Sequence, residues 1–251
     1  MGKLIAITGK GGVGKTTISA LLVKCFLESG KTPVLAIDAD PNSCLDAALG
    51  VTVKDTIGRA REDARAAAGK NAGISTRELL RLKIEQGLVE AKGFDLVAMG
   101  RPEGEGCYCY ANNILKEVIA EISSSYPYVV LDNEAGLENL SRRIVQKADM
   151  MVLVSDASNA GMQTLLRLYE LANEMKMSCG KLALVINKLR NDRPPCGIDE
   201  IREKTKADIA LCLPDDEEAA VFAEERRSFL EISESNRVYK KITELAEYFY
   251  Q

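Results

Sequence analysis

A glycine-rich loop between an apolar run and an amphipathic run is the feature that most limits how this chain can fold. The loop reads Gly9-Lys10-Gly11-Gly12-Val13-Gly14-Lys15-Thr16-Thr17 and follows the apolar run Lys3–Thr8. Its spacing is G-x-x-x-x-G-K-[ST], in which backbone N–H groups turn around an anion and the following helix adds its N-terminal dipole. We therefore expect a strand, this loop and a helix in succession, with phosphate groups bound between them.

The residues of this loop have separable roles in phosphate chemistry. Backbone N–H groups cradle the phosphates, Lys15 is expected to reach the β and γ phosphates, and the hydroxyl of Thr16 is expected to bind Mg²⁺. The expected nucleotide contacts are Gly11, Gly12, Val13, Gly14, Lys15, Thr16 and Thr17.

The same glycines also match the dinucleotide-binding pattern G-x-G-x-x-G. An acidic residue, Asp38, ends the next apolar run, as that pattern requires. Lys15 and Thr16 decide against this interpretation, because a dinucleotide pyrophosphate needs neither a lysine nor a Mg²⁺-binding hydroxyl at these positions. The sequence thus favours a nucleotide bound with Mg²⁺.

Apolar runs alternate with amphipathic runs along the whole chain. Continuous apolar runs are typical of strands buried on both faces of a parallel sheet. We expect a doubly wound α/β fold with a mostly parallel sheet of about seven strands, helices on both faces, and one domain spanning residues 1–251. The expected strands are Lys3–Thr8, Pro33–Asp38, Phe94–Met99, Tyr128–Asp132, Met150–Ser155, Leu182–Asn187 and Ile209–Leu213. The expected helical segments include Thr16–Glu28, Arg59–Lys70, Thr76–Ala91, Asn112–Ser123 and Met162–Met177.

Charge and composition exclude several classes of function. The chain has 33 Lys and Arg against 37 Asp and Glu, a net charge of −4, which argues against a nucleic-acid partner. No run of about 18 apolar residues is present, and no apolar leader precedes the first strand, so we expect no membrane partner and a cytoplasmic location. The chain contains seven Cys and no His, so the thiols are expected to be free and histidine chemistry is excluded.

Three acidic side chains lie at or just beyond the ends of two expected strands. Asp38 and Asp40 are two residues apart in an extended chain, so both carboxylates face the same side, toward the phosphate loop. Asp132 ends the buried run Val129–Asp132 and is expected to hold Mg²⁺. Asp40 could also cap a helix that starts near Asn42.

The run Val185–Arg190 bears on which base is bound. It begins like the guanine-recognition motif N-K-x-D, with Asn187 and Lys188, but Arg190 replaces the aspartate. A carboxylate is needed to accept hydrogen bonds from guanine, whereas a guanidinium only donates. We therefore expect adenine, with Asn187 at its edge and Lys188 among the nucleotide contacts.

A lysine inside the loop, Lys10, makes the pattern K-G-G-x-G-K-[ST]. In this the chain resembles the MinD, ParA and nitrogenase-iron-protein class of dimeric ATPases with a deviant Walker A motif. The resemblance implies a homodimer in which Lys10 reaches the nucleotide of the partner subunit. It also implies that Asp40 orients the attacking water, that Asp38 supports the Mg²⁺ shell, and that Pro214 belongs to a loop over adenine.

Two cysteines one residue apart, Cys107 and Cys109, lie among glycines that favour a loop. In a loop both thiols can face one way, but two thiolates do not complete a tetrahedral metal site, and the chain has no His to add. The same pair from a second subunit would give four thiolates, which suit Ni(II), Zn(II) or Cu(I). A reactive or incidental thiol pair is the simpler alternative.

Residues 103–110 and 132–143 together resemble one branch of this class, the nickel-insertion ATPases of carbon monoxide dehydrogenase (CooC type) and of acetyl-CoA synthase maturation. The likeness covers essentially the whole chain. It implies ATP-dependent dimerisation, Ni(II) at Cys107 and Cys109, with Zn(II) as a substitute, and delivery to a nickel enzyme. Two alternatives stay open: a partitioning ATPase of the MinD type without a metal role, and a thiolate metal sensor or storage protein.

The remaining segments have simpler expected roles. The last segment, Arg237–Gln251, has an apolar line that is expected to dock on the core rather than on a membrane. Cys25 and Cys212 are expected in the core, Cys179 and Cys196 in loops, and Cys44 in helix packing.

Overall fold

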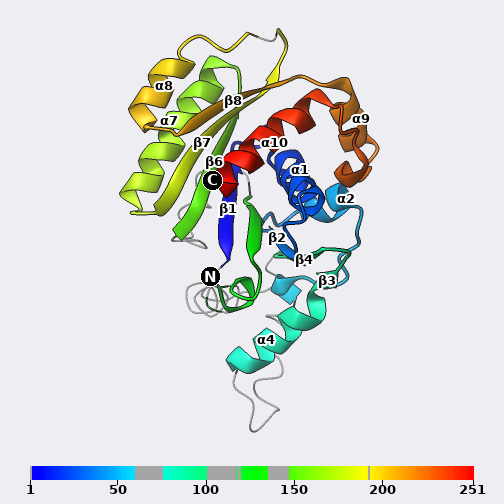
Figure 1. Ribbon diagram of the computed structural model, residues 1–251. Coiled ribbons are helices and arrows are strands. Elements are labelled where there is room, and N and C mark those ends of the chain that lie inside the picture. The colour runs from blue at the N-terminus through cyan, green and yellow to red at the C-terminus, as the bar shows by residue number, and fades with distance from the viewer. Residues whose placement is uncertain (1, 60–75, 101–116, 118–119, 135–146, 192) are drawn as a thin grey trace.

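Eight strands form one sheet in the computed structural model, which describes residues 2–59, 76–100, 117, 120–134, 147–191 and 193–251 (Figure 1). The strand order is β3-β4-β2-β5-β1-β6-β7-β8. The strands are β1 (Lys3–Gly9), β2 (Val34–Asp38), β3 (Val89–Glu90), β4 (Phe94–Ala98), β5 (Tyr128–Asp132), β6 (Lys147–Asp156), β7 (Ser178–Leu189) and β8 (Ile209–Pro214).

Helices pack on both faces of this sheet. Figure 1 shows α1, α2 and α10 on one side and α7 and α8 on the other. The described helices are α1 (Lys15–Glu28), α2 (Leu45–Leu49), α4 (Thr76–Gly87), α7 (Asn159–Glu174), α8 (Ile198–Thr205), α9 (Glu217–Glu224), the short 3₁₀ helix η1 (Phe229–Glu231) and α10 (Arg237–Tyr250). The expected doubly wound α/β fold is confirmed.

The sheet is parallel except at one edge, where β3 pairs antiparallel with β4. The helical expectation over Thr76–Ala91 is wrong in its last residues, because α4 ends at Gly87 and Val89–Glu90 join the sheet. Ala91 N donates to Phe94 O at 2.9 Å, and Gly93 has φ 86°. A tight hairpin through a left-handed glycine thus replaces the expected helix end.

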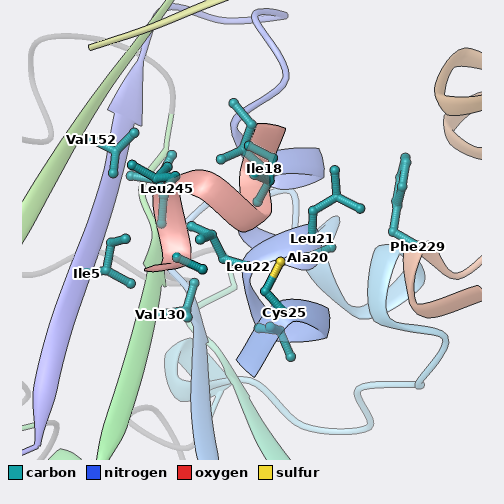
Figure 2. Packing of buried hydrophobic residues seen from close by; sticks show 14 of the residues in the cluster. Ile5, Ile18, Ala20, Leu21, Leu22, Cys25, Val130, Val152, Phe229 and Leu245 are labelled. Carbon is teal, nitrogen blue, oxygen red and sulfur yellow. The ribbon is translucent and has the colours of Figure 1, made fainter. Parts of the chain in front are cut away.

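Alternate residues of the central strands face separate cores on the two sides of the sheet. Ile5 and Ile7 of β1 face the core shared with α1 and α10, whereas Ala6 faces the core shared with α4. Figure 2 shows side chains of α1, such as Ile18 and Leu22, packed toward the strands and toward α10. Because side chains alternate across a strand, the sheet must be covered on both sides.

Helix α10 docks on the core through the residues expected from its apolar line. Val238, Ile242, Leu245 and Phe249 are all buried against α1 and the sheet. Within the described residues, no helix combines the length and the apolar character needed to cross a membrane.

The cysteines follow the expectations only in part. Cys25 is buried in α1, and Cys212 packs partly against the core between β6, β7, α7 and α8. Cys44 is exposed, so its expected role in helix packing is wrong. Cys179 lies in β7 rather than in a loop. The sequence does not indicate this, because the first residues of that strand are exposed and lack the apolar signal of a buried strand.

Candidate nucleotide-binding site

Two carboxylates come together where neighbouring parallel strands end. In the sheet register Asp38 of β2 lies opposite Asp132 of β5, and Asp132 lies opposite Ile7 of β1. The phosphate loop leaves β1 two residues later. The carboxyl ends of parallel strands thus bring both acids beside the loop, as expected for the ligand crevice of an open α/β sheet.

Asp132 is almost fully enclosed, with an exposed fraction of 1%. Its Oδ1 atom has no hydrogen-bond partner among the described residues. Burial raises the pKa of Asp132 to about 7, and the negative charge of Asp38 acts in the same direction, whereas Thr16 and Lys15 act against it. A buried carboxylate oxygen without a partner beside a threonine hydroxyl fits the oxygen ligands that Mg²⁺ takes.

Asp38 is committed to the backbone of the next loop. Its Oδ1 accepts a hydrogen bond from Asp40 N at 3.0 Å, and its Oδ2 accepts one from Leu45 N at 2.9 Å. Burial raises the pKa of Asp38 to about 6, although these two hydrogen bonds oppose the shift. Asp38 therefore shapes the connection that carries Asp40.

Helix α2 begins at Leu45 rather than near Asn42, so the expectation that Asp40 caps this helix is wrong. Asp38 accepts from the first residue of the helix instead, and Asp40 Oδ1 accepts from Asn42 N at 2.8 Å in a local turn. Asp40 is half-buried, and its negative charge acts on Lys15.

The phosphate loop has the backbone that its glycines predict. Gly12 and Gly14 have φ of 77° and 93°, a region that residues with a Cβ adopt at a cost. Gly14 caps the start of α1, and its carbonyl accepts from Ile18 N at 3.0 Å. The N–H groups of the first turn of α1 therefore remain available to an anion.

Lys15 is buried beneath this loop. Its Nζ donates to Lys10 O at 3.3 Å. Burial lowers the pKa of Lys15, and the negative charges of Asp132, Asp40 and Glu134 oppose that shift. A lysine surrounded by carboxylates next to backbone N–H groups is suited to hold a polyanion with a divalent cation. Lys10, in contrast, is exposed.

Asn187 and Lys188, expected as nucleotide contacts from the end of β7, lie against the phosphate loop. Asn187 Nδ2 donates to Val13 O at 2.8 Å, and Lys188 Nζ donates to Gly12 O at 2.9 Å. The sequence does not predict these contacts with the loop, because the run around Asn187 resembles only a base-recognition motif. The acceptors are carbonyls 174 and 176 residues away, which no local pattern indicates.

Pro214 is placed at the same edge of the sheet. It ends β8 opposite Leu189 of β7, and Asp215 N donates to Leu189 O at 2.8 Å. The expected adenine loop therefore starts next to the strand end that carries Asn187 and Lys188.

The paired cysteines Cys107 and Cys109 lie outside the described residues. Among the residues that are described, no group of three or more His, Cys, Asp or Glu side chains is arranged to hold a metal ion.

Comparison with known proteins agrees with this geometry. The sequence profile of the AAA domain family matches residues 2–184. An uncharacterised ATP-binding protein of Methanocaldococcus jannaschii is 40% identical over 247 residues, 97% of each chain. The carbon monoxide dehydrogenase accessory protein CooC of Rhodospirillum rubrum is 30% identical over 197 residues, 74% of each chain.

Solved structures share the fold at lower sequence identity. The MinD cell division protein of Aquifex aeolicus matches with a TM-score of 0.72 and 22% identity, covering 99% of this chain and 96% of that one. The MinD protein of Pyrococcus horikoshii, solved with Mg-ADP, matches with a TM-score of 0.70 and 19% identity over 99% and 96%. From the profile, the relatives and the phosphate loop together, the chain belongs to the AAA domain family and is a P-loop ATPase with the fold of MinD and ParA proteins.

Proposed function

We propose that residues 1–251 form one Mg²⁺-dependent ATPase domain that acts as a homodimer in the cytoplasm. In this proposal it binds Ni(II) as cargo through Cys107 and Cys109. It then inserts the metal into a nickel enzyme, either carbon monoxide dehydrogenase or acetyl-CoA synthase.

The observation that best supports the ATPase step is the unpartnered Oδ1 of Asp132, buried beside the phosphate loop. Thr16 and Asp132 would hold Mg²⁺, and Asp38 would keep the neighbouring loop in place. When bound, Mg²⁺ neutralises charge on the β and γ phosphates.

The protein's own groups have distinct parts in hydrolysis. Lys15 binds the β and γ phosphates, and Asp40 orients the water that attacks the γ phosphorus. The bond from that phosphorus to the β-phosphate oxygen breaks, and ADP and phosphate leave. Lys10 is exposed, which suits a side chain that offsets developing charge at the site of a partner subunit.

Two features support nickel as the cargo. The relative from Rhodospirillum rubrum is named as an accessory protein of carbon monoxide dehydrogenase. In the family that this chain resembles, that enzyme receives nickel. Cys107 and Cys109 are soft ligands one residue apart in a chain with no His, so a four-ligand thiolate site needs a second pair. A two-fold axis supplies that pair.

Nucleotide state and metal site are coupled mechanically in this proposal. ATP draws the two phosphate loops together across the two-fold axis, and the segments after Asp38 and Asp132 move. The spacing or exposure of the four thiolates then changes. Equal Ni(II) affinity in the ADP-bound and ATP-bound states would contradict this coupling.

The first experiment is a Ni(II) titration of the reduced, metal-free protein, read by thiolate charge-transfer absorbance and by mass in solution. It is repeated with ADP and with a slowly hydrolysed ATP analogue. We expect one Ni(II) per two chains, lost in the Cys107→Ser/Cys109→Ser double variant. The matched control is Cys44→Ser/Cys179→Ser, which removes two exposed thiols and should leave binding unchanged.

Other outcomes identify the alternatives. Ni(II) binding that does not depend on Cys107 and Cys109 would contradict metal insertion and favour a partitioning ATPase of the MinD type. Cys-dependent binding with no ATP turnover, even with each nickel enzyme added, would favour a metal sensor or storage protein.

A further inference from the structure

We infer that Asn187 and Lys188 act on the phosphate chain of the nucleotide by setting the shape of the phosphate loop, and that this is their main contribution to nucleotide affinity. This inference rests on the proposed function as an ATPase. The sequence predicts that the end of β7 recognises the base. The inference gives this strand end a different role, in shaping the phosphate loop.

The contacts themselves carry the argument. Lys188 Nζ donates to Gly12 O at 2.9 Å, and Asn187 Nδ2 donates to Val13 O at 2.8 Å. Two consecutive carbonyls of the loop are therefore held by two consecutive side chains of one strand end. Further along the loop, Gly14 O is held by Ile18 N.

The geometry of the peptide bond explains how these contacts orient the N–H groups of the loop toward an anion. In a planar trans peptide the C=O and the following N–H point in opposite directions. Holding Gly12 O toward Lys188 turns Val13 N–H away from β7, and holding Val13 O toward Asn187 turns Gly14 N–H away as well. Backbone N–H groups that converge in this way make a concave anion site before any phosphate arrives.

The backbone of Lys188 has an unusual conformation that fits this task. Its φ is 60°, in the left-handed region that a residue with a Cβ adopts only at a cost. Asn187 Oδ1 accepts from Lys188 N at 2.8 Å and stabilises this turn. The strand end is thus bent so that both side chains reach the loop.

Gly14 shows how closely the two segments approach. A Cβ built on Gly14 would lie 2.4 Å from Asn187 Nδ2, so the glycine leaves the room that the amide group needs. Asn187 is buried, with an exposed fraction of 8%, whereas Lys188 is exposed. Since a lost hydrogen bond matters more where water cannot replace it, Asn187 should carry the larger share.

The test compares ligands with and without the base. Affinities for inorganic triphosphate with Mg²⁺, for ADP with Mg²⁺ and for adenosine are measured by calorimetry in wild type, Asn187→Ala, Lys188→Met and Lys188→Arg. We expect Asn187→Ala to weaken triphosphate and ADP alike by roughly 10-fold or more, and Lys188→Met by roughly 3- to 10-fold. Lys188→Arg, which keeps a donor for Gly12 O, should recover most of the loss.

A lysine at the start of the same strand provides the matched control. Lys181 Nζ donates to Tyr248 O at 2.8 Å, far along β7 from the loop, so Lys181→Met removes the same charge from the same strand. It should leave all three affinities unchanged. Amide hydrogen exchange of Gly11–Thr17 without nucleotide should be faster in Asn187→Ala than in wild type, with global unfolding unchanged.

The other results each overturn the inference in a recognisable way. If the variants bind triphosphate normally and lose only ADP and adenosine, Asn187 and Lys188 are base contacts. If Lys188→Met weakens the binding of triphosphate and Asn187→Ala does not, the ammonium group of Lys188 acts directly on the phosphates through its charge. If wild type binds neither triphosphate nor ADP, the proposed ATPase function fails instead.

Discussion

A buried carboxyl group, that of Asp132, makes the stability of the protein depend on pH. Burial raises the pKa of Asp132 from its ordinary value of 3.8 to about 7 in the metal-free fold. Below pH 3.8 the group is protonated in both folded and unfolded chains and contributes nothing to the pH dependence. As pH rises toward 7 the unfolded chain ionises first, so the fold loses stability until the folded group ionises as well.

Replacing Asp132 by Asn should therefore stabilise the metal-free, nucleotide-free protein at pH 8. One unit of pKa shift corresponds to about 1.4 kcal/mol, and we expect a gain in the free energy of unfolding on the order of 1–3 kcal/mol. The gain should be absent near pH 4, and added Mg²⁺ with ADP should stabilise wild type only. Urea unfolding at both pH values measures this; an Asn variant less stable than wild type at pH 8 would contradict it.

Alanine variants of two glycines distinguish the effect of backbone strain from the effect of a close contact. Gly14 has φ 93° and faces Asn187 Nδ2, whereas Gly30 has φ 66° and nothing within 4 Å of an added Cβ. Gly14→Ala should lose nucleotide binding and about 2–4 kcal/mol of stability, from strain plus displacement of a buried amide. Gly30→Ala should lose about 1 kcal/mol and keep full binding. If calorimetry and urea unfolding show equal losses of nucleotide affinity and of stability in the two variants, the contact between Gly14 and Asn187 is unimportant.

At the scale of elements, one buried amide joins the starts of α9 and α10. Asn236 Oδ1 accepts from Val238 N at 2.9 Å and Tyr239 N at 3.0 Å, which caps α10. Its Nδ2 donates to Asp216 Oδ1 at 2.9 Å and to Glu218 Oε2 at 2.8 Å, at the start of α9. The junction lies just after Pro214, so it also fixes the segment expected over adenine.

Asn236→Ala should destabilise the protein by about 2 kcal/mol, because it removes a helix cap and takes one hydrogen-bond donor from each of the carboxylates of Asp216 and Glu218. Asn236→Asp keeps the acceptor for α10 but places a third carboxylate beside Asp216 and Glu218. Its deficit should shrink at low pH, where the introduced carboxyl group takes up a proton. Ser235→Ala, at the exposed neighbouring position, is the control. A deficit of the Asp variant that does not change with pH in urea unfolding would contradict this account.

At the scale of the whole molecule, the site is incomplete in one subunit if Lys10 acts across a dimer. Lys15 and Asp132 are buried at their own strand ends, whereas Lys10 is exposed on the same loop. We therefore expect a subunit to bind its own nucleotide with Lys15 and to present Lys10 to the partner subunit.

Mixing two inactive variants tests that arrangement. Lys10→Ala should bind nucleotide normally and hydrolyse ATP roughly 10²-fold or more slowly, and Lys15→Ala should lose nucleotide binding. In a mixed dimer the intact Lys15 site of one chain receives Lys10 from the other, so mixing should restore part of the turnover. No recovery at any mixing ratio, with dimers present by mass, would place Lys10 in its own subunit's site.

Much of this architecture was predictable because its signals are local. Parallel strands buried on both faces are continuous apolar runs, so all seven expected strands are present, although β6 and β7 begin three and four residues earlier than expected. The two-residue strand β3 was missed, because Val89–Glu90 are too few residues to show a period and pair only through a hairpin at Gly93.

The sequence by itself determined the phosphate loop, the class of fold and the acids that end β2 and β5. These depend on glycine backbone freedom and on apolar periodicity, which act over a few residues. Only the tertiary structure decided that Asp132 keeps an unpartnered oxygen, that Asp38 holds the start of α2, and that the end of β7 braces the loop. Such contacts follow from which strands become neighbours, and that choice depends on packing of the whole sheet between its helices rather than on spacing along the chain.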